Sequence, residues 1–169
     1  MSIELTHIAG AILVGLGGTL IMDAWALFLK RAFDISSLNY CLVGRWLLHM
    51  PDGTFKHSNI AAASTKQLEC PTGWIAHYVI GCIFALVLVI LTSGSWLERP
   101  TPLPALLFGI ATLVMPFLIM QPSFGLGIAA AKTPNPTRAR LGSLMAHTAF
   151  GIGLYLSALL ISQLLGTYA

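Results

Sequence analysis

Four long apolar runs dominate the pattern of hydrophobic and polar positions along the chain. They cover residues 5–29, 74–97, 103–121 and 141–165. Each has roughly 20 residues or more, which at a rise of about 1.5 Å per residue crosses a hydrocarbon layer of about 30 Å. The pattern predicts an all-α polytopic membrane protein, a four-helix transmembrane bundle that forms a single integral membrane domain over residues 1–169.

Prolines and small residues refine the four runs. Pro116 lies inside the third run, so we expect a kink there, with the helix resuming over residues 124–132. Asn135 and Pro136 are the expected cap and first residue of the fourth helix. Small residues spaced by four let membrane helices approach closely, so the first and fourth helices are expected to pack together. The small residues are Ala11, Gly15 and Thr19 in the first run, and two pairs in the fourth, Gly142 with Ala146 and Ala149 with Gly153.

The connection over residues 30–73 is far longer than two spans require. Its apolar segment 38–50, with Ser36 or Ser37 as the cap and Pro51 as the stop, predicts a short interfacial helix with Trp46 at headgroup level. A second short helix is expected over residues 58–68.

The basic residues are distributed asymmetrically. Eight of the nine Lys and Arg residues lie in the first and third connections, and only Arg99 lies in the second. The positive-inside rule therefore predicts that both basic connections are cytoplasmic and that both termini face outward. These flanks also account for the net charge of +3, so nucleic acid is not an expected partner.

Composition agrees with the lipid bilayer as the expected environment and partner. The chain is 56% hydrophobic and 9% charged, with a mean hydropathy of +0.81, whereas soluble domains have about a quarter charged residues. The first run lacks a basic leader and a small-residue cleavage site, so it is expected to be a retained span. The three cysteines are odd in number and have no CxxC or zinc spacing, so reduced thiols are expected.

Intramembrane polar residues provide the candidate site. Asp23 lies in the first span, where a carboxylate is costly and rare. Asp23 and His147 are each seven residues from a basic flank, which places both about 10 Å deep. His77, near the start of the second span, and Gln121, at the end of the third, belong to the same side. A carboxylate and two imidazoles at similar depth can pass protons, bind a divalent metal or ligate a haem.

Three functional hypotheses follow. The first is a binding or translocation module that handles protons or a small ion or solute. Arg45, with an anionic partner, and His49 and His57 are further candidates in the long connection. A transporter this small is expected to form a homo-oligomer. The second is a membrane-embedded metal or haem redox protein that uses His77 and His147, with Asp23 as a further metal candidate. The third is an assembly factor with no chemistry of its own.

Each candidate also has a purely structural interpretation. Asp23 can pair with a histidine or arginine for cohesion, and single histidines commonly pack through hydrogen bonds. Gln121 can satisfy backbone groups freed by the neighbouring kink. Solvation is the default for the connection residues Arg45, His49 and His57. Interface anchoring is the default for Trp46, Trp74, Trp96 and Tyr78.

Several segments together resemble a known family. They are GGTLIMDAW, VGRWLLHM, FKH, GWIAHYVIG, PFLIMQPSFGLGIAA, TPNPTRAR and MAHTAFGIGLYL. Their combination is similar to a family of small bacterial inner-membrane proteins of unknown function. The resemblance implies a four-span protein of the bacterial inner membrane. In that membrane, the outward orientation expected from the basic residues makes both termini periplasmic. It implies no catalytic residue, substrate or cofactor.

Overall fold

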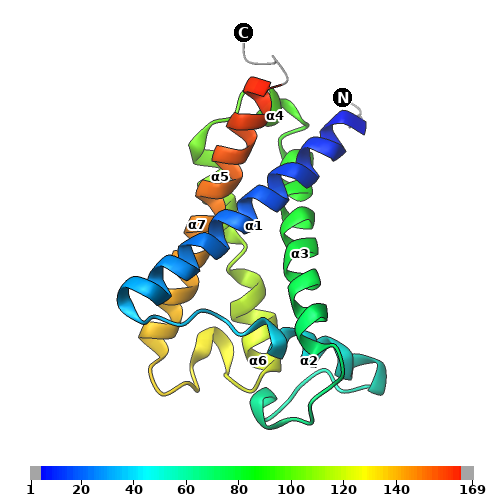
Figure 1. The fold of residues 1–169 in the computed structure, drawn as a ribbon, viewed down its shortest axis with the longest axis vertical. Coiled ribbons are helices and arrows are strands. Elements are labelled where there is room, and N and C mark those ends of the chain that lie inside the picture. Colours follow the sequence, from blue (N-terminus) through cyan, green and yellow to red (C-terminus); the bar gives the residue numbers. More distant parts are fainter. Residues whose placement is uncertain (1–4, 165–169) are drawn as a thin grey trace. The chain divides into compact units, whose positions relative to one another are not determined.

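The computed structural model describes residues 5–164 and is helical, with no strand in that range (Figure 1). The α-helices are α1 (Leu5–Phe33), α2 (Tyr40–His49), α3 (Glu69–Leu91), α4 (Ser95–Glu98), α5 (Pro102–Ala111), α6 (Gln121–Ser123) and α7 (Pro136–Leu164). The shorter elements are three 3-10 turns, η1 (Met50–Asp52), η2 (Ile60–Ala62) and η4 (Ile128–Ala130), and the π-helix η3 (Pro116–Met120).

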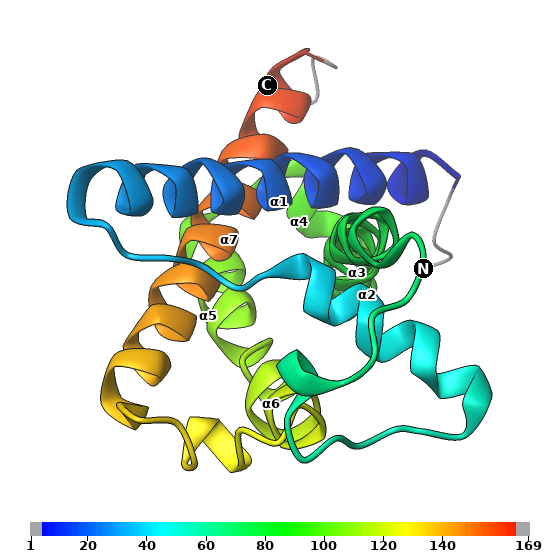
Figure 2. The ribbon, with the colours of Figure 1, turned by 60° about the horizontal axis from the view of Figure 1, so that its bottom comes forward.

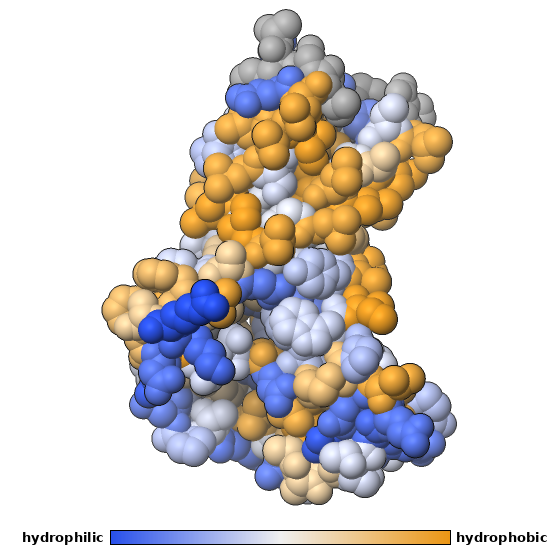
Figure 3. Space-filling model, in the orientation of Figure 1, coloured by the Kyte–Doolittle hydropathy of each residue, from blue (hydrophilic) through white to orange (hydrophobic). Residues whose placement is uncertain are grey.

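Four helical segments are long and apolar enough to cross a membrane. They are Leu5–Phe33, Glu69–Leu91, Pro102–Ser123 and Pro136–Leu164. Figure 3 shows apolar side chains gathered over large parts of the visible face of these helices. The all-α class and the four spans are therefore confirmed. The second span is shifted relative to the prediction, because a turn with left-handed Ser93 and Gly94 ends α3 before residue 97.

The third span is the most irregular. Helix α5 ends at Ala111, and the chain continues through the π-helix Pro116–Met120 into α6. A break near Pro116 is confirmed, because proline lacks the N–H that a regular helix needs. The expected helix over residues 124–132 is wrong. Left-handed φ values at Gly125, Gly127, Ala129 and Ala130 are incompatible with a continuous right-handed helix.

The start of α7 follows its sequence signal. Pro136 is the first helical residue, and the Oδ1 atom of Asn135 accepts a hydrogen bond of 3.0 Å from the backbone N–H of Arg138. This contact satisfies one of the N–H groups that a helix leaves unpaired at its start. The predicted cap is confirmed.

The chain divides into two compact units. Unit 1 consists of Met1–Ser36, Tyr78–Ala111 and Ala146–Ala169, and unit 2 consists of Ser37–His77 and Thr112–Met145. Within residues 5–164, each unit has its own apolar core. The prediction of a single integral membrane domain stays a prediction.

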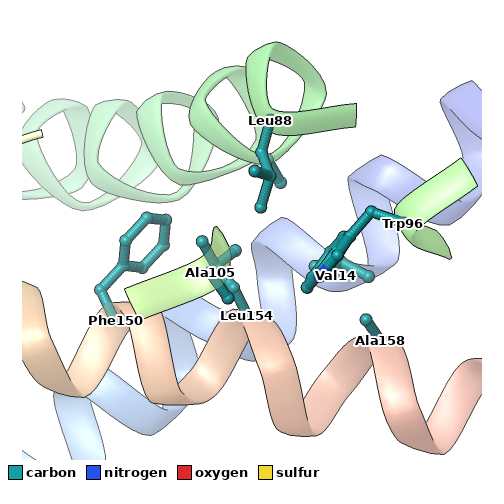
Figure 4. Close-up of a cluster of buried hydrophobic side chains, with 8 residues drawn as sticks. Val14, Leu88, Trp96, Ala105, Phe150, Leu154 and Ala158 are labelled. Carbon is teal, nitrogen blue, oxygen red and sulfur yellow. The ribbon is translucent and has the colours of Figure 1, made fainter. Parts of the chain in front are cut away.

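Unit 1 has an apolar core contributed by all of its helices (Figure 4). The core residues are Val14, Ala85, Leu88, Trp96, Ala105, Phe150, Leu154 and Ala158. Trp96 is only 4% exposed, and its indole N–H donates to the carbonyl oxygen of Thr101 at 3.0 Å. The interpretation of Trp96 as an interface anchor is therefore wrong, because its ring fills the core of this unit.

Glycines set the closest helix approaches in unit 1. A Cβ atom on Gly153 of α7 would lie 2.8 Å from the Cα of Gly18 on α1, so these helices touch backbone to backbone. The predicted packing of the first and fourth spans is confirmed. Gly15 of α1 faces α3 instead. A Cβ atom on Gly15 would lie 2.5 Å from the Cα of Cys82. A Cβ atom on Gly142 would have no other atom within 4 Å. The prediction that Gly142 lies in the contact between the first and fourth spans is therefore wrong.

Unit 2 is organised by the long connection and the end of the third span. Val43, Ile60 and Phe124 form its small core. The backbone N–H of His57 donates to Ser123 and that of Ile60 to Phe124, at 2.8 and 3.1 Å. These bonds hold the connection extended around the short turn Ile60–Ala62, so the expected helix over residues 58–68 is wrong.

The prediction of a helix over residues 38–50 is confirmed, since α2 covers Tyr40–His49. Its position at the membrane interface stays a prediction. Its cap is Asn39, whose side chain accepts a hydrogen bond from the N–H of Cys41 at 3.0 Å. The expected caps Ser36 and Ser37 lie outside the helix.

Candidate functional site

Asp23 of α1 makes a hydrogen bond to a second span inside unit 1. The Tyr78 hydroxyl of α3 donates to Asp23 Oδ2 at 3.0 Å, and both side chains are half-buried. The carboxylate therefore faces protein, as the periodicity of α1 predicts. A hydrogen bond to a charged acceptor contributes more than a neutral one, so the pair links α1 and α3 within the apolar span.

The position of this pair follows from the packing of α1 on α3. Gly15 lies on Cys82, and a Cβ atom on Gly81 would overlap the Thr19 hydroxyl. The same face of α1 presents Asp23 one turn after Thr19, because residues four apart share a helix face. Thr19 is buried and donates to the carbonyl oxygen of Gly15 at 2.8 Å, so it adds no unpaired group to the contact.

The other intramembrane candidates are divided between the two units. His147 belongs to α7 of unit 1. His77 belongs to unit 2, where its ring stacks on Tyr40 with centroids 4.0 Å apart and contacts Trp74 edge to face. The ring of His77 therefore has a packing role in this unit.

Gln121 is the most buried of the predicted site residues, with 6% of its surface exposed. Its Nε2 atom lies 3.4 Å from the Ser143 hydroxyl, whereas its Oε1 atom has no hydrogen-bond partner among the described residues. It directly follows the π-helix Pro116–Met120, and such elements often occur at functional positions. The prediction that Gln121 satisfies freed backbone groups is wrong within the described residues, because its amide nitrogen contacts the Ser143 hydroxyl and its amide oxygen has no partner.

Arg45 is at the centre of a polar network in unit 2. Its Nε and Nη2 atoms donate to the two carboxylate oxygens of Glu69, each at 2.8 Å. Its Nη1 atom donates to the carbonyl oxygens of Ile60, Ala61 and Ala63 at 3.1–3.3 Å. The hydrogen bond to Glu69 raises the pKa of Arg45 above its usual value, against the effect of burial.

This network corrects the expectation that Arg45 is solvated, because only 8% of its surface is exposed. All three guanidinium nitrogens already have partners in unit 2. An added anion would therefore have to displace Glu69 from Arg45. The geometry favours a structural role, in which one guanidinium fixes α2, the turn Ile60–Ala62 and the start of α3 relative to one another.

His49 and His57 lie next to this network. Their rings meet edge to face with centroids 5.0 Å apart, and His49 Nε2 lies 2.9 Å from the carbonyl oxygen of Ser64. His49 is 9% exposed and His57 is half-buried, so the expected solvation is wrong for both. Burial lowers the pKa of His57, and nearby His49 lowers it further. The Nε2 atom of His57 is buried without a hydrogen-bond partner in the described part of the chain.

Helix α2 crosses the start of α3 at two glycines (Figures 1 and 2). A Cβ atom on Gly44 would overlap the Glu69 carbonyl oxygen and would lie 2.6 Å from the backbone nitrogen of Gly73. Cys41 and Cys70 form a disulfide across the same crossing. The expectation of three reduced thiols is therefore wrong for two of them, whereas Cys82 is free.

The structure thus brings together Arg45, His49 and His57 in unit 2, and joins Asp23 to Tyr78 in unit 1. Among residues 5–164, no three His, Cys, Asp or Glu side chains are grouped as metal ligands. The hypothesis that Asp23, His77 and His147 hold a metal gains no support from this geometry.

The sequence analysis did not identify two hydrogen-bond partners of the candidate residues, Glu69 and Tyr78. Glu69 is one of only six acidic residues, and it lies at the start of an apolar helix, next to a long connection rich in basic residues. This position indicates a helix-start carboxylate that can pair with a basic residue of the connection. The frequency of tyrosine at membrane interfaces predicts an anchoring role for Tyr78 and gives no sign of its contact with Asp23. The packing of α1 against α3 determines that Tyr78 lies beside Asp23, and the sequence alone does not specify this packing.

The apolar helices and the carboxylate within them define a class, the polytopic α-helical integral membrane proteins. Within this class, the chain belongs to the family described as "Protein of unknown function (DUF2938)", whose model matches residues 12–161. No curated protein and no solved structure matches the chain.

Proposed function

We propose that the protein binds and passes protons or a small cation at Asp23, with Tyr78 as the hydrogen-bonding partner of the carboxylate. The observation that carries this proposal is the 3.0 Å contact between Tyr78 Oη and Asp23 Oδ2 on two membrane-spanning helices. Ionisable side chains within spans are costly and rare, and they mark ion pathways and proton relays.

The chemistry of the pair supports a relay. A carboxylate accepts a proton or coordinates a cation through its oxygens, and a tyrosine hydroxyl both donates and accepts hydrogen bonds. When Asp23 takes a proton or cation, the Tyr78 hydroxyl can turn and offer its own oxygen. Both groups are half-buried, so neither is sealed inside the core of unit 1.

An alternative uses His77 and His147 as ligands of a haem or metal. The ring of His77 is packed against Tyr40 and Trp74 in unit 2. We therefore base the functional proposal on Asp23 and Tyr78.

Flux measurements on reconstituted protein test the proposal. Vesicles that contain the wild-type chain should dissipate an imposed proton or cation gradient, and Asp23→Asn should abolish this flux because the amide keeps the shape and loses the charge. Tyr78→Phe should slow the flux about tenfold, which corresponds to one hydrogen bond to a charged group.

Glu98→Gln is the matched control, because Glu98 is an exposed carboxylate in α4 outside the four spans. It should leave the flux unchanged. Circular dichroism and size-exclusion chromatography should show that all three variants keep the helical fold. Wild-type flux in the Asp23→Asn variant would contradict the proposal, as would the absence of any gradient-driven flux in the wild type.

We further propose a bacterial inner-membrane location with both termini periplasmic, and a homo-oligomer in the lipid bilayer, since one four-span chain is small for a translocation pathway. The support for the orientation is the concentration of basic residues in two connections. An alkaline phosphatase fused to the C-terminus should be active, and a fluorescent protein fused there should be dark. The reverse pattern would refute the orientation.

A further inference from the structure

Two short segments of the same form meet in unit 2, and the proposed ion pathway uses neither. Cys41 precedes Gly44 in α2, and Cys70 precedes Gly73 in α3, each by three residues. Residues three apart share a helix face. The glycine contact therefore brings the two cysteines together, with their Cα atoms 3.9 Å apart.

Other contacts hold this crossing without the sulfur–sulfur bond. Arg45 and Glu69 form a two-pronged ion pair between α2 and α3, with side chains only 10% and 15% exposed. The Tyr40 ring lies against Trp74 and His77 of α3. Reduction of the disulfide would therefore leave the two thiols next to each other and able to pair again.

The positions of the cysteines also favour reactive thiols. Cys41 is the second residue of the ten-residue helix α2, and Cys70 is the second residue of α3. The start of a helix presents backbone N–H groups that have no partner within the helix, and the thiolate is the nucleophile in thiol–disulfide exchange. Both cysteines are half-buried, so neither belongs to the fully buried core of unit 2.

We propose that Cys41 and Cys70 are a reversible thiol–disulfide pair, a modification site that is switched by small-molecule disulfides such as glutathione disulfide. One cysteine thiolate attacks the small disulfide, forms a mixed disulfide and releases one small thiol. The second thiolate attacks the protein sulfur of that mixed disulfide, forms the Cys41–Cys70 bond and releases the second small thiol. The protein pair loses two protons and two electrons, and the small disulfide gains them.

The switch acts on α2 and the connection that follows it. In the oxidised state a covalent bond fixes the first turn of α2 to α3. In the reduced state the crossing depends on the Arg45–Glu69 pair and on the aromatic contacts. We therefore expect amide exchange in Tyr40–His49 to be faster after reduction, while α2 remains helical.

Equilibration of the purified full-length protein with glutathione redox buffers tests the proposal. A Cys82→Ser background removes the remaining thiol, and labelling with a maleimide polymer then counts the free thiols on a gel. The expected result is a transition between no label and two labels within the range of glutathione ratios found in cells, reversed when the ratio is reversed. Structural disulfides resist reduction by the glutathione pool, whereas regulatory ones respond to it.

Two labelling results would overturn the proposal. Protein that stays unlabelled at every ratio holds a permanent structural bond, and protein that takes two labels at every ratio does not form the bond under these conditions. Cys41→Ser in the same background leaves Cys70 without a partner thiol. It should carry one label in the reducing buffer, form a mixed disulfide with glutathione in the oxidising buffer, and lack the slower α2 amide exchange that the Cys41–Cys70 bond produces. If α2 amide exchange in Cys41→Ser still differed between the two buffers as it does in the parent protein, the Cys41–Cys70 bond would not be its cause, and the proposed switch would be refuted.

Discussion

Arg45→Ala, measured in reduced protein, is expected to destabilise unit 2 by about 1–3 kcal/mol, because it leaves the half-buried carboxylate of Glu69 without its partner. The same change removes the donor that serves the carbonyl oxygens of Ile60, Ala61 and Ala63. The connection over residues 53–68 should therefore become a preferred site of proteolysis. Denaturation in mixed micelles, followed by tryptophan fluorescence, gives the loss of stability, and mass spectrometry of the proteolytic fragments gives the site.

Lys66→Ala is the matched control for this prediction. Lys66 pairs with Asp52 at the exposed surface of the same connection, and such pairs contribute little. Glu69→Gln should lie between the two variants, because the amide keeps one carbonyl oxygen for Arg45 and loses the charge. If Arg45→Ala were no less stable than Lys66→Ala, the guanidinium would not be the group that fixes this connection.

Gly44→Val is expected to separate α2 from α3 and to prevent formation of the Cys41–Cys70 bond. A side chain at position 44 would overlap the Glu69 carbonyl oxygen, which is backbone and cannot turn aside. Overpacking typically costs about 1–3 kcal/mol and occasionally more, and the forced displacement also lengthens the Arg45–Glu69 contact. Thiol labelling after oxidation reports the loss of the disulfide, and amide exchange in Tyr40–His49 reports the loss of packing.

Gly142→Ala provides the comparison, because Gly142 is a helical glycine with nothing within 4 Å of its Cβ position. Alanine is favoured over glycine in a helix interior by about 1 kcal/mol. This variant should therefore be neutral or more stable and should keep the disulfide. A Gly44→Val protein that still forms the Cys41–Cys70 bond at the wild-type rate would show that the glycine contact is not required.

The two polar sites of the molecule differ in kind. Asp23 and Tyr78 lie on helices that the apolar core of unit 1 already holds together. The packing of these helices therefore does not depend on the hydrogen bond between the two side chains. Arg45 and Glu69 lie where unit 2 has only a small apolar core. Polar contacts and a disulfide therefore carry more of the structure in unit 2. Substitutions at Asp23 should affect activity first, and substitutions at Arg45 should affect stability first.

The sequence alone determined the features that depend on local pattern. Four apolar runs of sufficient length produce four spans, because an exposed backbone inside lipid must form its hydrogen bonds within its own segment. The cap at Asn135 and Pro136 and the helix over Tyr40–His49 follow from residues within a few positions of each other. The inward face of Asp23 follows from helical periodicity.

Only the tertiary structure decided the partners of these residues. Tyr78 is 55 residues from Asp23, and Glu69 is 24 residues from Arg45. No local pattern specifies which turn of α3 lies beside each of them. The extended backbone around Ile60 is held by carbonyl groups of residues 123 and 124, which overrides the local preference of an alanine-rich segment for helix. The disulfide has the same origin, because the Gly44–Gly73 contact that joins Cys41 to Cys70 exists only after α2 has packed on α3.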